Sequence, residues 1–254
     1  QGVSSAASDV YKRQFNNCQN KTGKWGVLMR YEIMQPGAFA FLKVNLEAGE
    51  AIKSESDAMM MMSGNIKVEG KMEGGMLGGL ARKFLSGESL FFQKLTAQNK
   101  AGEAVLAPPI PGDVGVYELQ GNTLCITSGG FLAAEESVKI ETKMQNLGKG
   151  LFSGAGLFVV KASGNGTLFF NSFGAIYPIE LQAGEEMVVD TGHLVAWDAD
   201  MNYKVTKASS GIMSSLTSGE MLVCKFTGPG KVYTQSRNPG SFGAWVGGVL
   251  PAHG

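Results

Sequence analysis

The sequence is poor in the residues that build metal centres and disulfide frameworks. It contains only two histidines, His193 and His253, and three cysteines among 254 residues, and no Cys-x-x-Cys motif occurs. A transition-metal site needs clustered histidine, cysteine or carboxylate ligands, so this scarcity argues against one. We therefore expect neither a metal nor a cofactor.

Charge and long apolar runs are scarce as well. Charged residues make up 17% of the chain, and 22 basic residues balance 22 acidic ones, so no overall field attracts nucleic acid or an anionic membrane. No run of about 18 apolar residues is present that could span a bilayer. Cys125 and Cys224 lie in apolar runs and are expected to be buried thiols rather than a disulfide. These features predict a cytoplasmic protein.

Glycine, in contrast, is abundant, with 36 residues. The glycines separate short apolar or alternating runs between Ala38 and Tyr233, where turns with positive φ suit glycine best. Such runs are typical of strands. Helical periodicity is weak, and the best candidate, residues 77–85, is interrupted by Gly78 and Gly79. The sequence therefore predicts an all-β protein.

One phrase, a Ser-Gly turn followed by an apolar strand, occurs three times, beginning at Ser86, Ser153 and Ser218. The regular spacing indicates one supersecondary unit used three times. The expected units are residues 76–139, 140–207 and 208–240, the last completed by residues 39–68. We therefore expect a single domain over residues 29–240, a closed pseudo-threefold body of sandwich-like or β-helix-like form.

The two ends of the chain differ from the repeats. Residues 1–14 resemble a translated adapter-like string found at the ends of assembled metagenomic reading frames, and we expect residues 1–28 to be a non-native leader before a start at Met29. Residues 241–254 form an apolar, glycine-rich tail. Because this tail is too short to cross a membrane, we expect it to pack on the domain, join an oligomer interface or touch a membrane surface.

Three segments carry a family resemblance: QNLGKGLFSGAGLF at 145–158, GHLVAW at 192–197 and FTGPGKVYTQS at 226–236. They resemble the altered-inheritance-of-mitochondria protein family, and the resemblance extends from Met29 essentially to the C-terminus. It implies a β-helical sandwich similar to the tryptophan RNA-binding attenuation protein. The bacterial members of that family have no established activity, and the mitochondrial members are associated with inner-membrane organisation.

Two apolar features are candidate contact sites. Residues 59–62 are four consecutive methionines, which strand alternation places two on each face, so that Met60 and Met62 share one face. Methionine-rich surfaces are adaptable and recur at binding sites, although a strand buried on both faces would explain the run equally well. Trp245, in the tail, is the second candidate contact.

His193 is the centre of an alternative, polar site. Together with Asp190 and Tyr177 it could form a small-molecule or hydrolytic site in a cleft between repeats. However, His193 aligns with Gly130 of the preceding repeat, which favours a turn histidine bonded to the backbone. We assign no residue a catalytic role.

The leading hypothesis is therefore a non-enzymatic binding or scaffold protein that acts through self-association or a protein partner. The alternative is the small-molecule or hydrolytic site near His193. RNA binding is suggested by fold analogy alone, and neither the balanced charge nor a nucleic-acid motif supports it.

Overall fold

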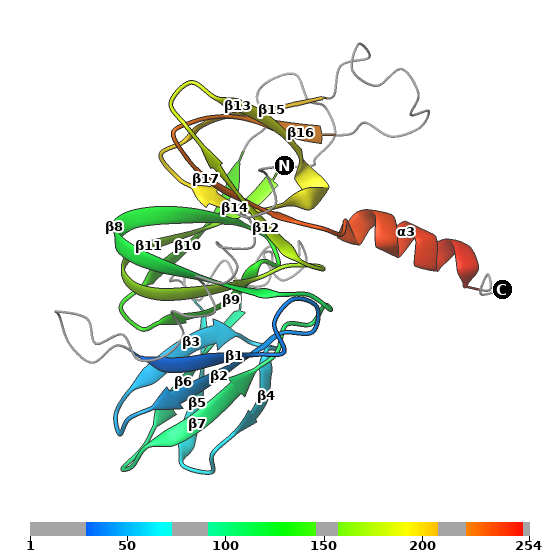
Figure 1. The fold of residues 1–254 in the computed structure, drawn as a ribbon. Helices are drawn as coiled ribbons and strands as arrows, with labels where there is room; N and C mark the ends of the chain where they lie inside the picture. Colours follow the sequence, from blue (N-terminus) through cyan, green and yellow to red (C-terminus); the bar gives the residue numbers. More distant parts are fainter. Residues whose placement is uncertain (1–28, 73–90, 146–156, 208–221, 251–254) are drawn as a thin grey trace, which may run out of the picture.

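The computed structural model of the chain describes residues 29–72, 91–145, 157–207 and 222–250. Within these ranges the regular elements are strands apart from one 3₁₀ turn and one α-helix, so the all-β prediction is confirmed. The expected leader, the helix candidate at 77–85 and the three Ser-Gly turns lie outside the described residues. Figure 1 shows three groups of strands stacked one on another, with the helix projecting from the side.

The first group, at one end of the stack, contains seven strands (Figure 1). They are β1 (Arg30–Met34), β2 (Phe41–Leu46), β3 (Ala51–Glu55), β4 (Met59–Met62), β5 (Ile66–Met72), β6 (Phe91–Ala97) and β7 (Gly102–Leu106). Strand β7 lies between β2 and β4, and β1 pairs with the outer side of β2. Strand β6 lies between β3 and β5.

The middle group is built on two long strands, and the two halves of each strand have different neighbours. Its strands are β8 (Val114–Thr127), β9 (Phe131–Glu135), β10 (Lys139–Gln145) and β11 (Leu157–Asn171). The second half of β11, residues 166–171, lies between residues 114–120 of β8 and strand β9. The first half of β11 lies between residues 123–127 of β8 and strand β10.

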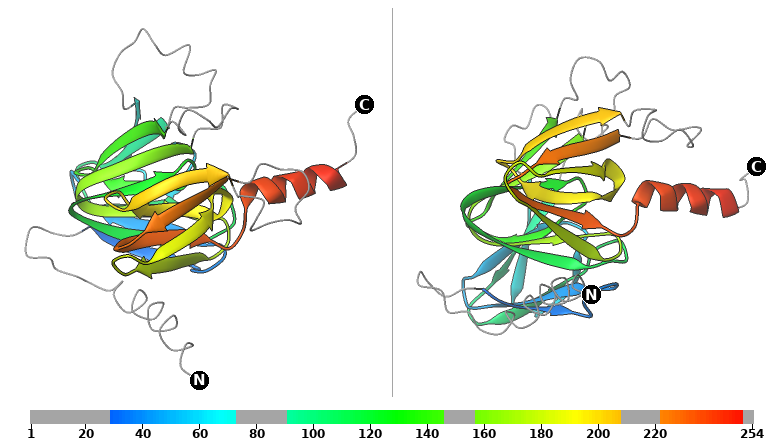
Figure 2. Two further views of the ribbon diagram at one scale, coloured as in Figure 1. Left: turned by 90° about the horizontal axis from the view of Figure 1, so that it is seen from above. Right: turned by 45° about the horizontal axis from the view of Figure 1, so that its top comes forward.

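The last group forms the other end of the stack (Figures 1 and 2). Its elements are β12 (Ile176–Leu181), β13 (Glu186–Asp190), the 3₁₀ turn η1 (Thr191–His193), β14 (Leu194–Asp198), β15 (Asn202–Lys207), β16 (Leu222–Thr227) and β17 (Gly230–Gln235). Strand β17 lies between β12 and β14, and β16 lies between β13 and β15.

Antiparallel pairing joins the groups at two junctions. At the first junction β3 pairs with β9, with Lys53 opposite Ala134, and at the second β8 pairs with β14, with Cys125 opposite Trp197. These pairings merge most strands into one ten-stranded sheet, while β1, β2, β7 and β4 form a separate sheet at one end and β13, β16 and β15 another at the opposite end.

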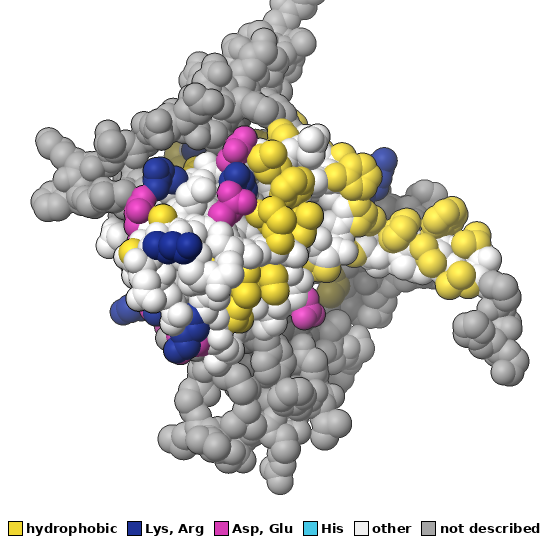
Figure 3. Space-filling view, turned by 90° about the horizontal axis from the view of Figure 1, so that it is seen from below, with side chains coloured by type: hydrophobic (Ala, Val, Ile, Leu, Met, Phe, Trp, Pro, Cys, Tyr) yellow, Lys and Arg dark blue, Asp and Glu magenta, His cyan; other side chains and the backbone are white. Residues whose placement is uncertain are grey.

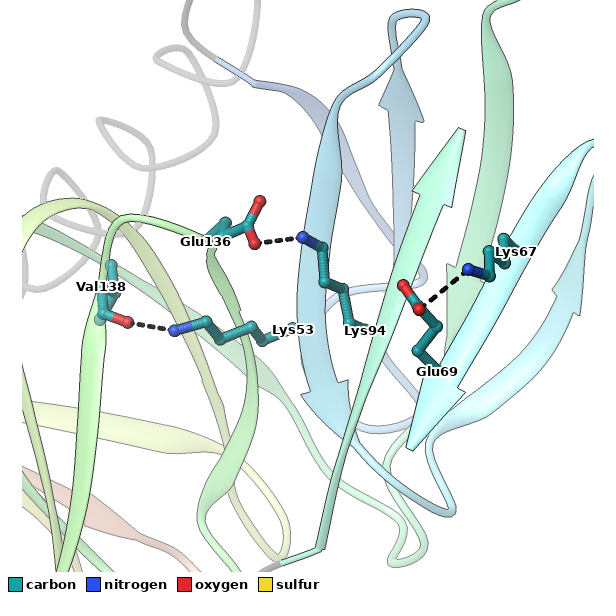
Figure 4. A network of polar contacts seen from close by, with 6 residues as sticks. All are labelled: Lys53, Lys67, Glu69, Lys94, Glu136 and Val138. Carbon is teal, nitrogen blue, oxygen red and sulfur yellow. Dashed lines mark hydrogen bonds and ion pairs between the residues drawn. The ribbon is translucent and has the colours of Figure 1, made fainter. Parts of the chain in front are cut away.

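Polar contacts reinforce both junctions. At the first, Lys53 Nζ donates to the backbone oxygen of Val138 at 2.8 Å, and Lys94 forms an ion pair with Glu136 (Figure 4). At the second, the Tyr117 hydroxyl donates to Asp198 Oδ1 at 2.8 Å. Burial and the adjacent Asp198 carboxylate raise the pKa of Tyr117, so this hydroxyl keeps its proton and the hydrogen bond.

The hydrophobic core crosses both junctions. The first cluster includes Leu42 and Ile52 of the first group together with Leu132 and Phe169 of the middle one. The third cluster includes Trp197 and Phe226 of the last group together with Cys125 and Val159 of the middle one, again across a junction. Because each cluster contains side chains from more than one group of strands, the apolar side chains of each group are buried partly by its neighbour.

The expected closure of the ring is not observed in the described strands. Residues 39–68 were predicted to complete a unit with residues 208–240, but β2 and β3 pair with β7 and β6 of their own group. Strands β16 and β17 pair instead with strands from residues 176–207. None of the three described sheets returns to its own first strand.

The tail contains a helix that the sequence analysis did not predict. Helix α3 (Pro239–Val249) follows β17, and the Asn238 side chain caps it by accepting hydrogen bonds from the backbone nitrogens of Gly240 and Ser241. Asparagine at the cap followed by proline at the first position is a recognised helix start. In the part of the chain that the structure describes, no helix is long and apolar enough to cross a membrane.

Trp197 provides a test of the core. Its side chain is fully buried, with the rings of Tyr203 and Phe226 at 5.2 and 5.9 Å between centroids. We expect Trp197→Ala to lower the free energy of unfolding by about 3–5 kcal/mol because it leaves a large cavity. The matched control is Trp245→Ala, an exposed tryptophan, which should change it by less than about 0.5 kcal/mol. Urea unfolding would measure both, and equal effects would contradict this account of the core.

Candidate functional site

The first candidate surface is strand β4, an edge strand made only of methionine. Among the described strands it pairs with β7 alone, with Met62 opposite Ala104 and Met61 opposite Val105. All four side chains, Met59 to Met62, are 37–59% exposed. A strand buried on both faces is therefore not what the structure contains. Figure 3 shows hydrophobic side chains gathered on the lower face of the molecule, where the first group lies.

The second candidate surface is strand β13, at the opposite end of the stack. Among the described strands it pairs with β16 alone, with Val188 opposite Lys225. Val189 is buried, but Met187 and Val188 are 38% and 53% exposed. An ion pair of 2.8 Å joins Lys225 to Glu186 beside these apolar side chains. Strand β13 thus has one edge that no described strand pairs with, and two exposed apolar residues.

Strands in comparable positions at the junctions are buried. Ala133 and Ala134 of β9, and Ala196 and Trp197 of β14, are fully buried where these strands pair with a neighbouring group. Strand β4 follows β3 by a short turn, as β9 follows β8 and β14 follows β13, yet no described strand covers its outer edge. Among the described strands, β4 lacks the second neighbouring strand that β9 and β14 have, and this difference explains why its methionines are exposed.

The polar candidate, His193, lies in the turn η1 and faces the backbone. Its ring Nδ1 is 2.8 Å from the backbone oxygen of Gln235, and the Gln235 side chain in turn donates to the backbone oxygen of Gly192. These contacts tie η1 to the end of β17. The turn histidine bonded to the backbone, favoured by the repeat alignment, is the arrangement found.

The two residues expected beside His193 have separate positions. The Asp190 carboxylate accepts a hydrogen bond from the backbone nitrogen of Gly192 at 2.9 Å and so caps η1. Tyr177 is exposed on β12, where its backbone oxygen accepts from the Thr234 hydroxyl. Within the described residues no hydrogen bond joins the side chains of the three. The hydrolytic site thus stays a prediction without a converging geometry.

Metal ligands do not converge in the described residues either. In the four described ranges, no group of three or more histidine, cysteine, aspartate or glutamate side chains is placed to hold a metal ion. Cys125 and Cys224 are buried free thiols, as the sequence predicted. Burial raises the pKa of Cys125 to about 11 and that of Cys224 to about 12, so both are held as neutral thiols.

Comparison with known proteins places this architecture in a family. A model described as mitochondrial biogenesis AIM24 matches residues 31–237, which is all of the strand body and ends just before α3. The chain belongs to the AIM24 family. The resemblance inferred from the sequence motifs is thereby confirmed.

Two relatives of this AIM24 chain come from the same species. An uncharacterized protein of Streptococcus pyogenes serotype M6 is 33% identical over 230 residues, which cover 88% of this chain and 92% of the relative. A crystal structure of a Streptococcus pyogenes protein is similar with a TM-score of 0.72 and 32% identity, covering 87% of this chain and 100% of that one. Neither description assigns an activity, so function must be argued from the surfaces described above.

The buried thiols give a direct chemical test. In a Cys18→Ser variant, which leaves Cys125 and Cys224, we expect the native protein at pH 8 to react with Ellman's reagent roughly a hundred times more slowly than the unfolded protein, because burial suppresses both the thiolate and access to it. Two thiols should react fully in guanidinium chloride. Rapid reaction of either thiol in the native protein would contradict the described burial.

Proposed function

We propose that this AIM24-family protein is a non-enzymatic scaffold that associates with further copies of itself, head to tail, by pairing β4 of one copy with β13 of the next. One observation carries the proposal. Strand β13 is equivalent to β3 and β8, and β4 is equivalent to β9 and β14, the strands that pair at the two internal junctions. The cytoplasmic location and the likeness to the attenuation protein remain predictions from the sequence.

The first support is a common pairing scheme in the three groups. We infer three units of six strands each, over residues 41–106, 114–171 and 176–235, counting each half of β8 and β11 as one strand. In every unit the first strand pairs with the sixth, the second with the fifth, the third with the sixth and the fourth with the fifth. The boundaries of these units differ from those expected from the Ser-Gly phrase. The expected units begin at residues 76, 140 and 208, whereas the inferred units begin at residues 41, 114 and 176.

The third strand of each unit shares a local irregularity. The pairing of β4 with β7 skips Met60, that of β9 with β11 skips Leu132, and that of β14 with β17 skips Val195. Such bulges are specific features of a strand rather than random defects. The shared position supports equivalence of Met62 with Ala134 and Trp197.

The second support is the rule by which units join. At both internal junctions, the second strand of one unit pairs with the third strand of the next: β3 with β9, and β8 with β14. The second strand of the last unit is β13 and the third strand of the first unit is β4. No described strand pairs with the outer edge of β5, β10 or β15, so these three strands take no part in either junction.

The internal junctions also specify a register between copies. Within the three units, Lys53 lies opposite Lys94, Cys125 opposite Lys161 and Val188 opposite Lys225 in the strand register. Val188 is therefore the equivalent of Lys53 and Cys125. Lys53 lies opposite Ala134 at the first junction, and Cys125 lies opposite Trp197 at the second. By the same rule Val188 of one copy would lie opposite Met62 of the next, and Val189 opposite Met61.

The chemistry of the two edges suits this contact. Among the described strands, the outer edges of β4 and β13 have no strand partner for their backbone donors and acceptors, and both strands carry apolar side chains that pairing would remove from water. Methionine side chains can adapt to the facing strand. Because the two surfaces differ, the contact is heterologous, and it closes into a ring or continues as a filament according to the rotation per copy. The closure expected within one chain would then occur between chains.

Cross-linking tests the register. In a Cys18→Ser background, we expect a Val188→Cys protein mixed with a Met62→Cys protein to form a mixed disulfide under mild oxidation, since cross-strand neighbours are close enough for the bond. In the matched control, the Met62→Cys protein is replaced by a Phe39→Cys protein, which carries the cysteine at another exposed apolar position. This control should yield at least about tenfold less of the mixed disulfide. Equal yields from both pairs would refute the register.

Charge at the edge tests association itself. We expect the wild-type chain to elute as a multiple of its own mass in size exclusion with light scattering, and Val188→Lys to elute as a single chain, because lysine on an edge strand opposes strand addition. Val68→Lys, at an exposed position of β5, should leave the mass unchanged. A wild-type protein that is a single chain at all concentrations would rule out the proposal.

A further inference from the structure

Helix α3 leaves the body of the protein with little contact to it. It projects outward in both views of Figure 2, and none of its residues is buried. One ring contact fixes its base, with Phe242 5.2 Å from Phe173 between centroids. Farther along, Trp245 is 63% exposed, and Val249 and Leu250 are similarly open. Apart from adjacent residues and the backbone of the helix itself, no described atom lies within 4 Å of where a side chain would begin at Gly243, Gly247 or Gly248.

The helix has no side that prefers water. Residues 238–250 include no charged residue, and Ser241 is the one hydroxyl-bearing side chain. At 100° per residue, the large apolar side chains of Phe242, Trp245, Val246, Val249 and Leu250 share one face. The opposite face carries glycine, alanine and Ser241, and no charged residue. A helix that is apolar all round is normally surrounded by an apolar medium.

Water alone would not maintain this helix. Four of its eleven residues are glycine, which is the poorest helix former after proline. Isolated helices of this length are marginal in water even when they are rich in alanine. A hydrocarbon medium has the opposite effect, because it offers the backbone no other hydrogen-bond partners and so enforces the helical pairing.

We propose that α3 inserts into the surface of a lipid bilayer and attaches the strand body to it. Eleven residues at 1.5 Å each give a length of about 16 Å, roughly half the hydrocarbon thickness of a bilayer, so α3 would enter one leaflet without crossing it. Arg237, which precedes the cap and is exposed, would then lie at the level of the headgroups.

Lipid fits α3 better than a protein groove does. A groove covers one face of a helix, whereas the absence of charge extends over both faces of α3. The helix also projects free of the body, so its tip can enter a bilayer without a collision of the strands with the headgroups (Figures 1 and 2). The family match ends at residue 237, before the first residue of α3. This inference does not depend on pairing between copies.

Vesicle binding of the full-length chain tests the insertion. With phosphatidylcholine vesicles, we expect co-flotation of the wild-type protein that persists at 1 M salt, because the attraction is apolar rather than electrostatic. Val249→Glu, at the exposed tip of the helix, should reduce the vesicle-bound fraction by at least about tenfold. The matched control Val68→Glu, an exposed valine on β5, should bind as the wild type does. Both variants should keep the wild-type urea midpoint.

Fluorescence locates the insertion. In a Trp25→Phe background, emission comes from buried Trp197 and exposed Trp245, and we expect brominated phosphatidylcholine to quench the Trp245 component. Trp245→Phe should abolish that quenching while the protein still binds. Absence of vesicle binding, or binding that Val249→Glu does not weaken, would overturn the inference. So would a lipid-free oligomer that Val249→Glu dissociates, since α3 would then dock on a second copy. Cross-linking of Val188→Cys to Met62→Cys reports the edge pairing separately.

Discussion

The architecture depends on hydrogen bonding between strand edges of successive groups. A buried strand edge must pair its backbone donors and acceptors, because an unpaired group away from water is costly. Strands β3 and β8 meet this requirement through β9 and β14, and each of the three apolar clusters combines residues of neighbouring groups across these pairings. The ion pair of Lys94 with Glu136 and the hydrogen bond of Tyr117 to Asp198 lie across the same two seams. Stability, core and stacking direction all follow from this one constraint.

If β4 pairs with β13 of another copy as proposed, the same constraint accounts for the methionines of β4. At a junction that is always paired, small or rigid residues can pack permanently, as Ala133, Ala134 and Ala196 do. A strand edge that is covered only when two copies associate is exposed to water in the single chain, so its side chains must be compatible with both environments. Methionine is apolar enough to gain from burial and flexible enough to fit a facing strand. Four in succession give this edge a composition unlike that of either internal counterpart.

Local features were predictable from the sequence, and non-local pairing was not. Alternating runs and glycine turns predicted the strands that became β6, β11 and β16, and the apolar surroundings of Cys125 and Cys224 predicted buried thiols. A repeat, however, has no intrinsic first residue. The hairpin at 41–55 matches others in sequence whether it pairs with 91–106 or with 222–235, and only packing decides between them. The sequence therefore indicated three units but not that, among the described strands, β4 and β13 lack a neighbour on one side.

Helix α3 was missed for a different reason. Its glycines lower helix propensity, and its lack of polar residues removes the periodicity that identifies an amphipathic helix. Asn238 followed by Pro239 was the remaining signal, a cap and a first-turn proline that read equally well as a turn. The sequence signals for this helix are thus confined to its cap and first turn.

The two proposed contacts constrain each other. A single short, glycine-rich helix buries a limited apolar area, so one copy would bind lipid less tightly than several linked copies. Several copies held together would bind far more tightly, because after the first insertion the others become intramolecular. This gain requires all the helices to meet one plane. A closed ring with its axis along the membrane normal places every α3 at the same height, whereas an open filament turns successive helices away from the bilayer. Lipid binding would therefore favour the closed form of a head-to-tail assembly over the open one.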